Sequence, residues 1–146
     1  MRNETSVLRL FRGLLWLYPS EFLDHFGKTN PSGKVKRGGV TDKLLSDYPN
    51  LFGDLSANSG NNALSRDPEF TEGFLRRHED KLIFGSDCSC IDGKGGGTAQ
   101  VGNPAASRLA GKCVARETLT LLKKTVSPAA FKKMTWENAH RTYKLA

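Results

Sequence analysis

The chain lacks the residues that would identify a disulfide scaffold or a histidine-rich metal centre. Its 146 residues include three cysteines and three histidines. An odd cysteine count without framework spacing favours a reducing compartment, so we expect a cytoplasmic protein. No apolar run is long enough to cross a bilayer, and no membrane association is expected. His25, His78 and His140 are too scattered to form a recognisable metal motif.

Aromatic residues beside the basic clusters are also lacking. The net charge of +7 is high enough to consider nucleic acid as a partner. However, basic and acidic residues are interleaved, and the clusters at 34–37 and 123–124 carry no aromatics for base stacking. The glycine-rich segment 90–103 lacks the GK[ST] ending of a phosphate loop. We therefore expect no specific nucleic-acid partner.

The chain does contain a short apolar segment that ends on a carboxylate. Leu82, Ile83 and Phe84 form an unbroken apolar run, which is typical of a strand buried on both faces. Asp87 follows where this strand would leave the sheet. In parallel α/β folds, catalytic groups gather at the carboxyl ends of strands, so Asp87 is a candidate functional residue. The alternative is an aspartate that only caps a turn.

A second strand-like segment, 51–56, precedes the first and leads into a polar loop at 57–62. A helix with Asp67 as its N-cap and proline at the first helical position separates the two segments. This order predicts a βαβ unit with parallel strands. The loop that contains Asn58 and Ser59 would then share one rim of the sheet with Asp87.

The remaining segments are mostly helical in pattern. Helices are predicted over 7–18, 41–48, 104–125 and 127–145, and His78 is interpreted as a cation at the end of the helix that starts at Asp67. Asp54 lies inside the segment 51–56. A buried acid needs a partner, and we interpret Asp54 as a carboxylate hydrogen-bonded to neighbouring backbone or to an arginine.

The cysteines offer a weaker alternative site. Cys88, Cys90, Cys113 and a histidine could form a zinc knuckle, because thiolates and imidazoles suit zinc. The Cys-x-Cys spacing differs from that of the usual structural sites, and Cys113 falls inside a predicted helix. A nucleophilic Cys88 or Cys90 would need a base, and no histidine is close in sequence. Both alternatives rank below Asp87.

Three segments together suggest a family. They are YPNLFGDLSANSG at 48–60, LIFGSD at 82–87 and WENAHR at 136–141. In this order and spacing they resemble the C-terminal part of the amidohydrolase family, and in particular its amidohydrolase-related branch of metal-dependent hydrolases and decarboxylases. The resemblance covers roughly residues 31–145. Each motif alone is weak, and their agreement makes the resemblance specific.

The resemblance implies an α/β fold, the C-terminal portion of a TIM-like (β/α)8 barrel that is incomplete in this chain. Residues 1–30 would form a helical N-terminal segment, and residues 31–146 the βα units. The resemblance also implies a divalent metal, usually zinc, with Asp87 as metal ligand and general base. Asn58 and Ser59, by position, would contact a small-molecule substrate.

The family's histidine ligands have no counterparts here. There is no His-x-His pair, no ligand stands near 17–19, and His25 comes too late to take that role. Two or three βα units cannot close a barrel of about 250 residues. We therefore expect an incomplete hydrolase, from a truncated or frameshifted gene, that binds zinc weakly and is inactive alone. The alternative is a non-catalytic interaction module, a half-barrel that assembles with itself or with a separate N-terminal half.

Overall fold

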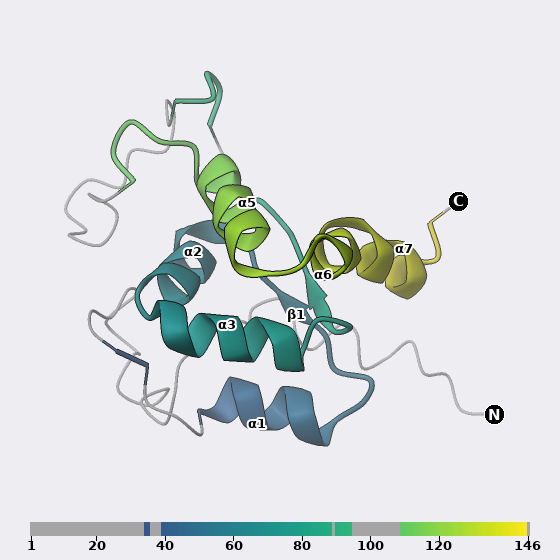
Figure 1. The fold of residues 1–146 in the computed structure, drawn as a ribbon. Helices are drawn as coiled ribbons and strands as arrows, with labels where there is room; N and C mark the ends of the chain where they lie inside the picture. The colour runs from purple at the N-terminus through teal and green to yellow at the C-terminus, as the bar shows by residue number, and fades with distance from the viewer. Residues whose placement is uncertain (1–33, 36–38, 89, 95–108, 146) are drawn as a thin grey trace.

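The structure, a computed structural model, describes residues 34–35, 39–88, 90–94 and 109–145 (Figure 1). The elements are α1 (Val40–Asp47), β1 (Gly53–Asp54), α2 (Ala57–Ser65), α3 (Pro68–Arg77), β2 (Leu82–Ile83), α5 (Val114–Thr125), α6 (Pro128–Lys132), the π-helical turn η4 (Lys133–Glu137) and α7 (Asn138–Tyr143). The helices predicted at 41–48, after Asp67 and at 127–145 are confirmed. The helix predicted at 7–18 lies outside the described residues, as does most of the glycine-rich segment.

The two strands form a parallel pair, as the sequence predicts. Gly53 lies opposite Leu82, and Asp54 lies opposite Ile83. Backbone hydrogen bonds continue the pairing beyond these residues. At one end the Gly53 N–H donates to the Lys81 carbonyl at 2.8 Å, and at the other end the Ala57 N–H donates to the Ser86 carbonyl at 3.2 Å. The regular strands are shorter than the predicted segments, but the paired stretch has nearly their length. Its carboxyl end is the rim expected to hold the site.

The polar segment 57–62 is helical, so the prediction of a loop there was wrong. It forms the first part of α2, which starts directly after β1. Gly60 permits this tight exit, because a Cβ at that position would lie 2.7 Å from the Leu55 carbonyl oxygen. Asn61 is buried and donates to Thr118 Oγ1 of α5 at 2.9 Å. Tertiary packing has thus overcome the weak helix propensity of asparagine, serine and glycine.

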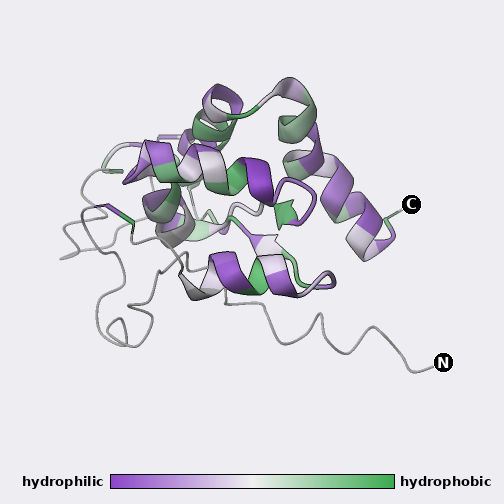
Figure 2. Ribbon diagram, turned by 60° about the horizontal axis from the view of Figure 1, so that its bottom comes forward, coloured by the Kyte–Doolittle hydropathy of each residue, from purple (hydrophilic) through white to green (hydrophobic). Residues whose placement is uncertain are grey.

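The core lies where the helices meet the strand pair. In Figure 1, α3 lies beside α1, and α5 lies beside α2. The helices α6 and α7 extend from there toward the C-terminus. Figure 2 shows hydrophilic and hydrophobic residues alternating along the helices, the pattern of helices with one buried face. The buried cluster draws residues from the helices α1, α2, α3, α5 and α6, from the turn η4 and from the strand pair with its flanking residues: Leu45, Leu51, Leu55, Ala63, Leu64, Phe74, Leu75, Leu82, Leu122, Ala130 and Met134.

The C-terminal helical segment covers the edge of β2 that faces away from β1. The Phe84 N–H donates to the Met134 carbonyl at 2.8 Å, within the π-helical turn. Asn138 is fully buried, and its Nδ2 donates to the Leu82 carbonyl at 2.8 Å. Both bonds satisfy strand groups that would otherwise pair with another strand. The motif at 136–141 therefore has a structural task in this fold.

Polar contacts also fix α1 against α3. His78 is the C-cap of α3, as predicted, and its Nε2 lies 2.6 Å from Asp42 Oδ1. Arg77 donates to the other oxygen of Asp42 at 2.8 Å. Partial burial disfavours the charged carboxyl, but these bonds to His78 and Arg77 outweigh it and lower the pKa of Asp42.

In the described part of the chain, no helix has the length and apolarity needed to span a bilayer.

Candidate functional site

Two carboxylates share the rim at the carboxyl end of the strand pair. Asp54 is the last residue of β1, and Asp87 follows β2 by four positions. Partial burial raises the pKa of Asp54, and the nearby negative charge of Asp87 raises it further, although hydrogen bonds from Ser56 and from the Gly85 backbone oppose the shift. The sequence predicted the backbone partners of Asp54. It did not predict that Asp87 would lie close by.

Asp87 has an unusual backbone. Its φ is 42°, in the left-handed region, where aspartate and asparagine are tolerated better than most residues. The side chain is exposed to solvent. Such conformations cluster at functional sites, although turns also use them. The position is thus compatible with both interpretations of Asp87, a functional carboxylate and a turn residue.

Gly85 makes room for the carboxylate of Asp54. A Cβ at Gly85 would lie 2.6 Å from Asp54 Oδ1 and 3.2 Å from the Cβ of Ser56. Any larger residue would therefore displace the acid. The segment Gly85-Ser86-Asp87 thus has two roles. Its glycine leaves room for the Asp54 carboxylate, and its aspartate supplies the second carboxylate of the rim.

Asn58 and Ser59 lie in the first turn of α2 rather than in a loop. This turn begins at the same rim, because the Ala57 N–H donates to the Ser86 carbonyl at 3.2 Å. Asn58 is half-buried. The structure therefore brings α2 and the segment that leads to Asp87 together, as the sequence predicted, and contact with a substrate stays a prediction.

All three cysteines meet at one place. The Cys88 and Cys113 sulfurs are 3.5 Å apart, and the sulfurs of Cys88, Cys90 and Cys113 all lie within 4.8 Å of one another. The prediction that Cys113 falls inside a helix was wrong, because α5 begins at Val114 and Cys113 is its N-cap. The 25 positions between Cys88 and Cys113 gave no indication of this contact.

The environment shifts the pKa of Cys88 and the pKa of Cys113 in opposite directions. Partial burial disfavours the Cys88 thiolate, but the N–H groups of Cys90 and Ala115 and the Cys113 thiol outweigh it and lower the pKa of Cys88. The Arg116 N–H favours the Cys113 thiolate, but burial and Cys88 prevail and raise the pKa of Cys113. The two sulfurs are hydrogen-bonded to each other, and either thiol can be the donor.

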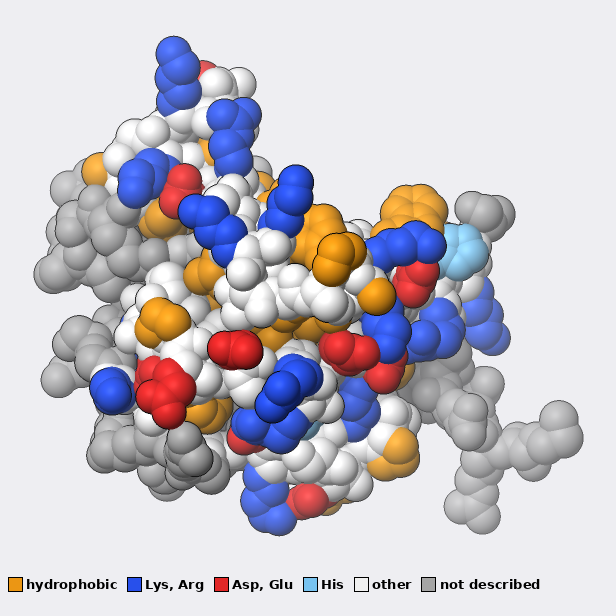
Figure 3. Space-filling model, viewed as in Figure 1, with side chains coloured by type: hydrophobic (Ala, Val, Ile, Leu, Met, Phe, Trp, Pro, Cys, Tyr) orange, Lys and Arg blue, Asp and Glu red, His pale blue; other side chains and the backbone are white. Residues whose placement is uncertain are grey.

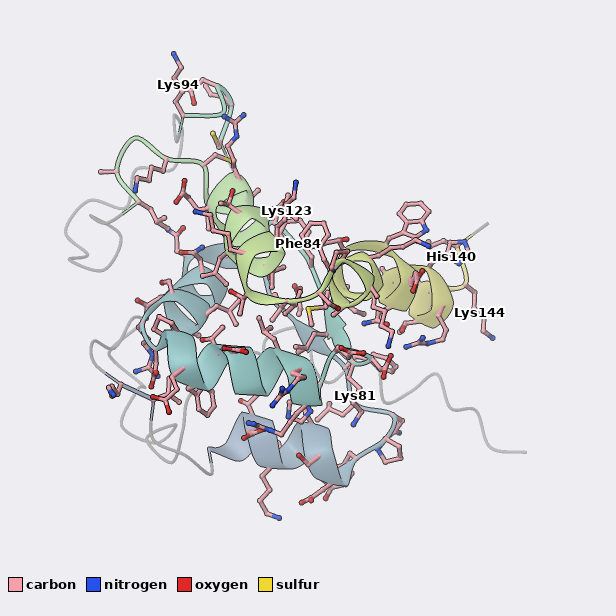
Figure 4. The ribbon with its side chains drawn as sticks, viewed as in Figure 1. Lys81, Phe84, Lys94, Lys123, His140 and Lys144 are labelled. Atoms are coloured by element: carbon pink, nitrogen blue, oxygen red, sulfur yellow. The ribbon has the colours of Figure 1, made fainter. Side chains whose placement is uncertain are left out.

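Among the residues that the structure describes, no histidine joins the three cysteines as the fourth ligand of a zinc knuckle. His78 is engaged with Asp42, and His140 lies against the Trp136 ring at 5.9 Å between centroids. Figure 4 shows His140 on α7, far across the molecule from Lys94 at the tip of the cysteine-bearing loop. His25 lies outside the described residues.

A surface depression of about 320 Å³ lies between α2, α3 and α5. Its lining is formed by Asn61, Leu64, Ser65, Pro68, Thr71, Glu117, Thr120, Leu121, Lys124 and Thr125. Neither rim carboxylate nor any cysteine contributes to it.

Figure 3 shows acidic and basic side chains interspersed over the face of the molecule that it presents. The absence of a specific nucleic-acid partner stays a prediction.

Comparison with known families identifies the class of protein. The sequence model of the amidohydrolase family matches residues 8–145. This match spans most of the chain, which therefore belongs to the amidohydrolase family, as its motifs predict. No match was found among curated proteins or among solved structures.

Amidohydrolases generally use divalent metal ions, and the structure allows the fit of such an ion to be tested. In residues 34–35, 39–88, 90–94 and 109–145, the cysteine cluster is the only group of three possible metal ligands. Asp87 belongs to no such group, whereas a catalytic zinc takes three protein ligands and keeps one position open. The described residues alone do not fit a complete catalytic metal site, and we assign no reaction step to a metal.

Proposed function

We propose that this chain provides the strand-end carboxylate of a metal-dependent hydrolase, and that Asp87 is its metal ligand and general base. The observation that carries the proposal is the position of Asp87 beside Asp54, at the carboxyl end of a parallel strand pair in an amidohydrolase chain. β1 and β2 would be the seventh and eighth strands of a TIM-like barrel. Catalytic residues of such barrels lie at this end of the strands.

The chemistry of the rim supports this role. An exposed carboxylate can accept the proton of an attacking water when it lies within hydrogen-bond reach. Asp54 stays close to Asp87, and Gly85 keeps the space that the Asp54 carboxylate occupies. Asn58 and Ser59, on the adjoining turn of α2, would contact the substrate, a small molecule with a hydrolysable amide or ester bond.

The proposed site needs ligands beyond the described residues. Asp87 and Asp54 offer only carboxylate oxygens, and zinc held by one or two such groups binds weakly. We therefore expect the isolated chain to bind zinc weakly at the rim and to show no hydrolase activity.

The test uses manganese, because Mn²⁺ prefers carboxylate and water ligands and avoids the thiols. In an NMR titration, Mn²⁺ should broaden the resonances around Asp87 and Asp54 before those of other acidic positions. Asp87→Asn should abolish this effect, since asparagine keeps the tolerance for positive φ but loses the charge. Cys113→Ser is the matched control and should leave the broadening unchanged.

Two results would contradict the proposal. One is broadening that survives Asp87→Asn, which would show that the ion binds elsewhere. The other is hydrolysis of an ester or amide panel that persists in Asp87→Asn. Turnover by the unmodified chain that depends on Asp87 would support its role as base and refute the expected inactivity.

A second candidate function is assembly as a half-barrel, with another copy or with a separate N-terminal half. It is favoured by the strand pair, in which β1 pairs with β2 on one side and no other strand is found among the described residues. An unpaired strand edge is a template for another chain. Light scattering over a concentration series should show a dimer or higher oligomer. A monomer at every concentration would refute self-assembly.

A further inference from the structure

The cysteine cluster is separate from the rim carboxylates in composition and in chemistry. The chain has three cysteines in its 146 residues, and the fold gathers all of them. Cys88 and Cys90 come from the segment after β2, and Cys113 comes from the start of α5. Figure 4 shows this loop, with Lys94 at its tip, above the N-terminal end of α5. Each of the three cysteines is only partly buried, so an ion can reach the cluster from solvent.

The spacing of the sulfurs suits one soft metal ion. A tetrahedral zinc with Zn–S bonds of about 2.3 Å separates its sulfurs by about 3.8 Å. The observed distances, 3.5 Å for Cys88 to Cys113 and at most 4.8 Å within the group, span this value. We propose that Cys88, Cys90 and Cys113 form a three-thiolate zinc site that fastens the loop after β2 to the start of α5. This site is structural and distinct from the rim.

Groups around the sulfurs support ligation. The Cys90 N–H donates to the Cys88 sulfur at 3.4 Å, as in the outer shells that orient thiolate ligands. Asp92 Oδ1 lies 3.4 Å from the Cys90 sulfur and accepts a bond from the Lys94 N–H at 2.8 Å. The Asp92 carboxylate is thus an outer-shell partner of Cys90, and the fourth position of a zinc ion would be left to water. On binding, each protonated thiol releases its proton to solvent.

A disulfide between Cys88 and Cys113 is the competing use of these residues. Their sulfurs are 3.5 Å apart, so closing a bond of about 2.05 Å would need only a small movement. A disulfide would leave Cys90 beside the pair without a role. It would also require an oxidant, whereas metal ligation accounts for all three sulfurs in their reduced state.

The experiment titrates Co²⁺ into the full chain, reduced and metal-free, in the absence of oxygen. We expect one equivalent to produce intense sulfur-to-cobalt charge-transfer absorption, which one equivalent of Zn²⁺ then bleaches. Each of Cys88→Ser, Cys90→Ser and Cys113→Ser should reduce this absorption and weaken zinc binding. The loss should exceed the roughly 10–100-fold cost of removing an outer-shell partner. His140→Ala, a control on α7 away from the cysteines, should keep the spectrum of the unmodified chain.

A second measurement needs no variant and so does not depend on variant folding. Zinc should protect all three cysteines of the unmodified chain from alkylation, as counted by mass spectrometry. Equal alkylation with and without zinc would overturn the proposal, as would a cobalt spectrum without charge-transfer bands. Bands that survive all three cysteine substitutions would also overturn it. The manganese test at Asp87 is independent, so either site can fail while the other stands.

Discussion

Removing the side chain of Asn138 should weaken the whole fold. Its Nδ2 donates to the Leu82 carbonyl at 2.8 Å and to the Glu79 carbonyl at 2.7 Å. In Asn138→Ala the Leu82 carbonyl stays buried without this donor, which costs about 1–3 kcal/mol. The Glu79 carbonyl is nearer to water, and its lost bond costs about 0.5–1.5 kcal/mol. We therefore expect the free energy of unfolding to fall by about 1.5–4.5 kcal/mol.

Urea denaturation followed by circular dichroism measures this loss. The midpoint should fall while the slope with denaturant stays constant, because the folded surface is unchanged. His140→Ala is the matched control, since His140 is exposed in the same helix and its loss should change stability by no more than about 0.5 kcal/mol. A loss below about 0.5 kcal/mol for Asn138→Ala would refute the reasoning, because the carboxamide would then not satisfy the edge of β2.

Two further changes probe single contacts. Gly85→Ala should push Asp54 away from Asp87 and into solvent, so the pKa of Asp54 should fall toward its ordinary value in an NMR titration. The control Gly73→Ala meets only a flexible arginine side chain and should leave that pKa unchanged, and an unshifted Asp54 in Gly85→Ala would contradict the crowding. Asp42 has a folded pKa below its unfolded value of 3.8, so its stabilising effect is present above that pH and is lost as the pH falls through the folded pKa. The stability difference between the unmodified chain and Asp42→Asn should therefore shrink on acidification. A difference in urea midpoints that stays constant from neutral pH down to the lowest pH at which the chain is folded would contradict the ion pairing.

The sequence predicted well those elements whose structure depends on local chemistry. Asp67 accepts a bond from the Phe70 N–H at 3.3 Å, as an N-cap followed by proline should. The two apolar segments pair in parallel because α2 and α3 separate them by a crossover, and this geometry places Asp87 at the rim. Family membership was also predictable, because it rests on three motifs in a fixed order.

Features that depend on contacts between distant residues were not predictable in the same way. The segment 57–62 has the composition of a loop, and its helical structure depends on packing against α5 through contacts such as Asn61 with Thr118. The proximity of Cys113 to Cys88 depends on where α5 begins. Propensity places helix ends to within a few residues at best, and here that margin decided whether Cys113 lay inside the helix or at its N-cap.

The C-terminal helix also constrains how a barrel could be completed around this chain. The Phe84 N–H and the Leu82 carbonyl, which point away from β1, are bonded to Met134 and Asn138. A strand added beside β2 would first have to break these two hydrogen bonds. On the outer side of β1, no strand of the described residues stands in the way. If the chain assembles as a half-barrel, association should therefore begin at β1. Asn138→Ala, which releases the Leu82 carbonyl, should then leave the dimer in place while it lowers the stability of each copy.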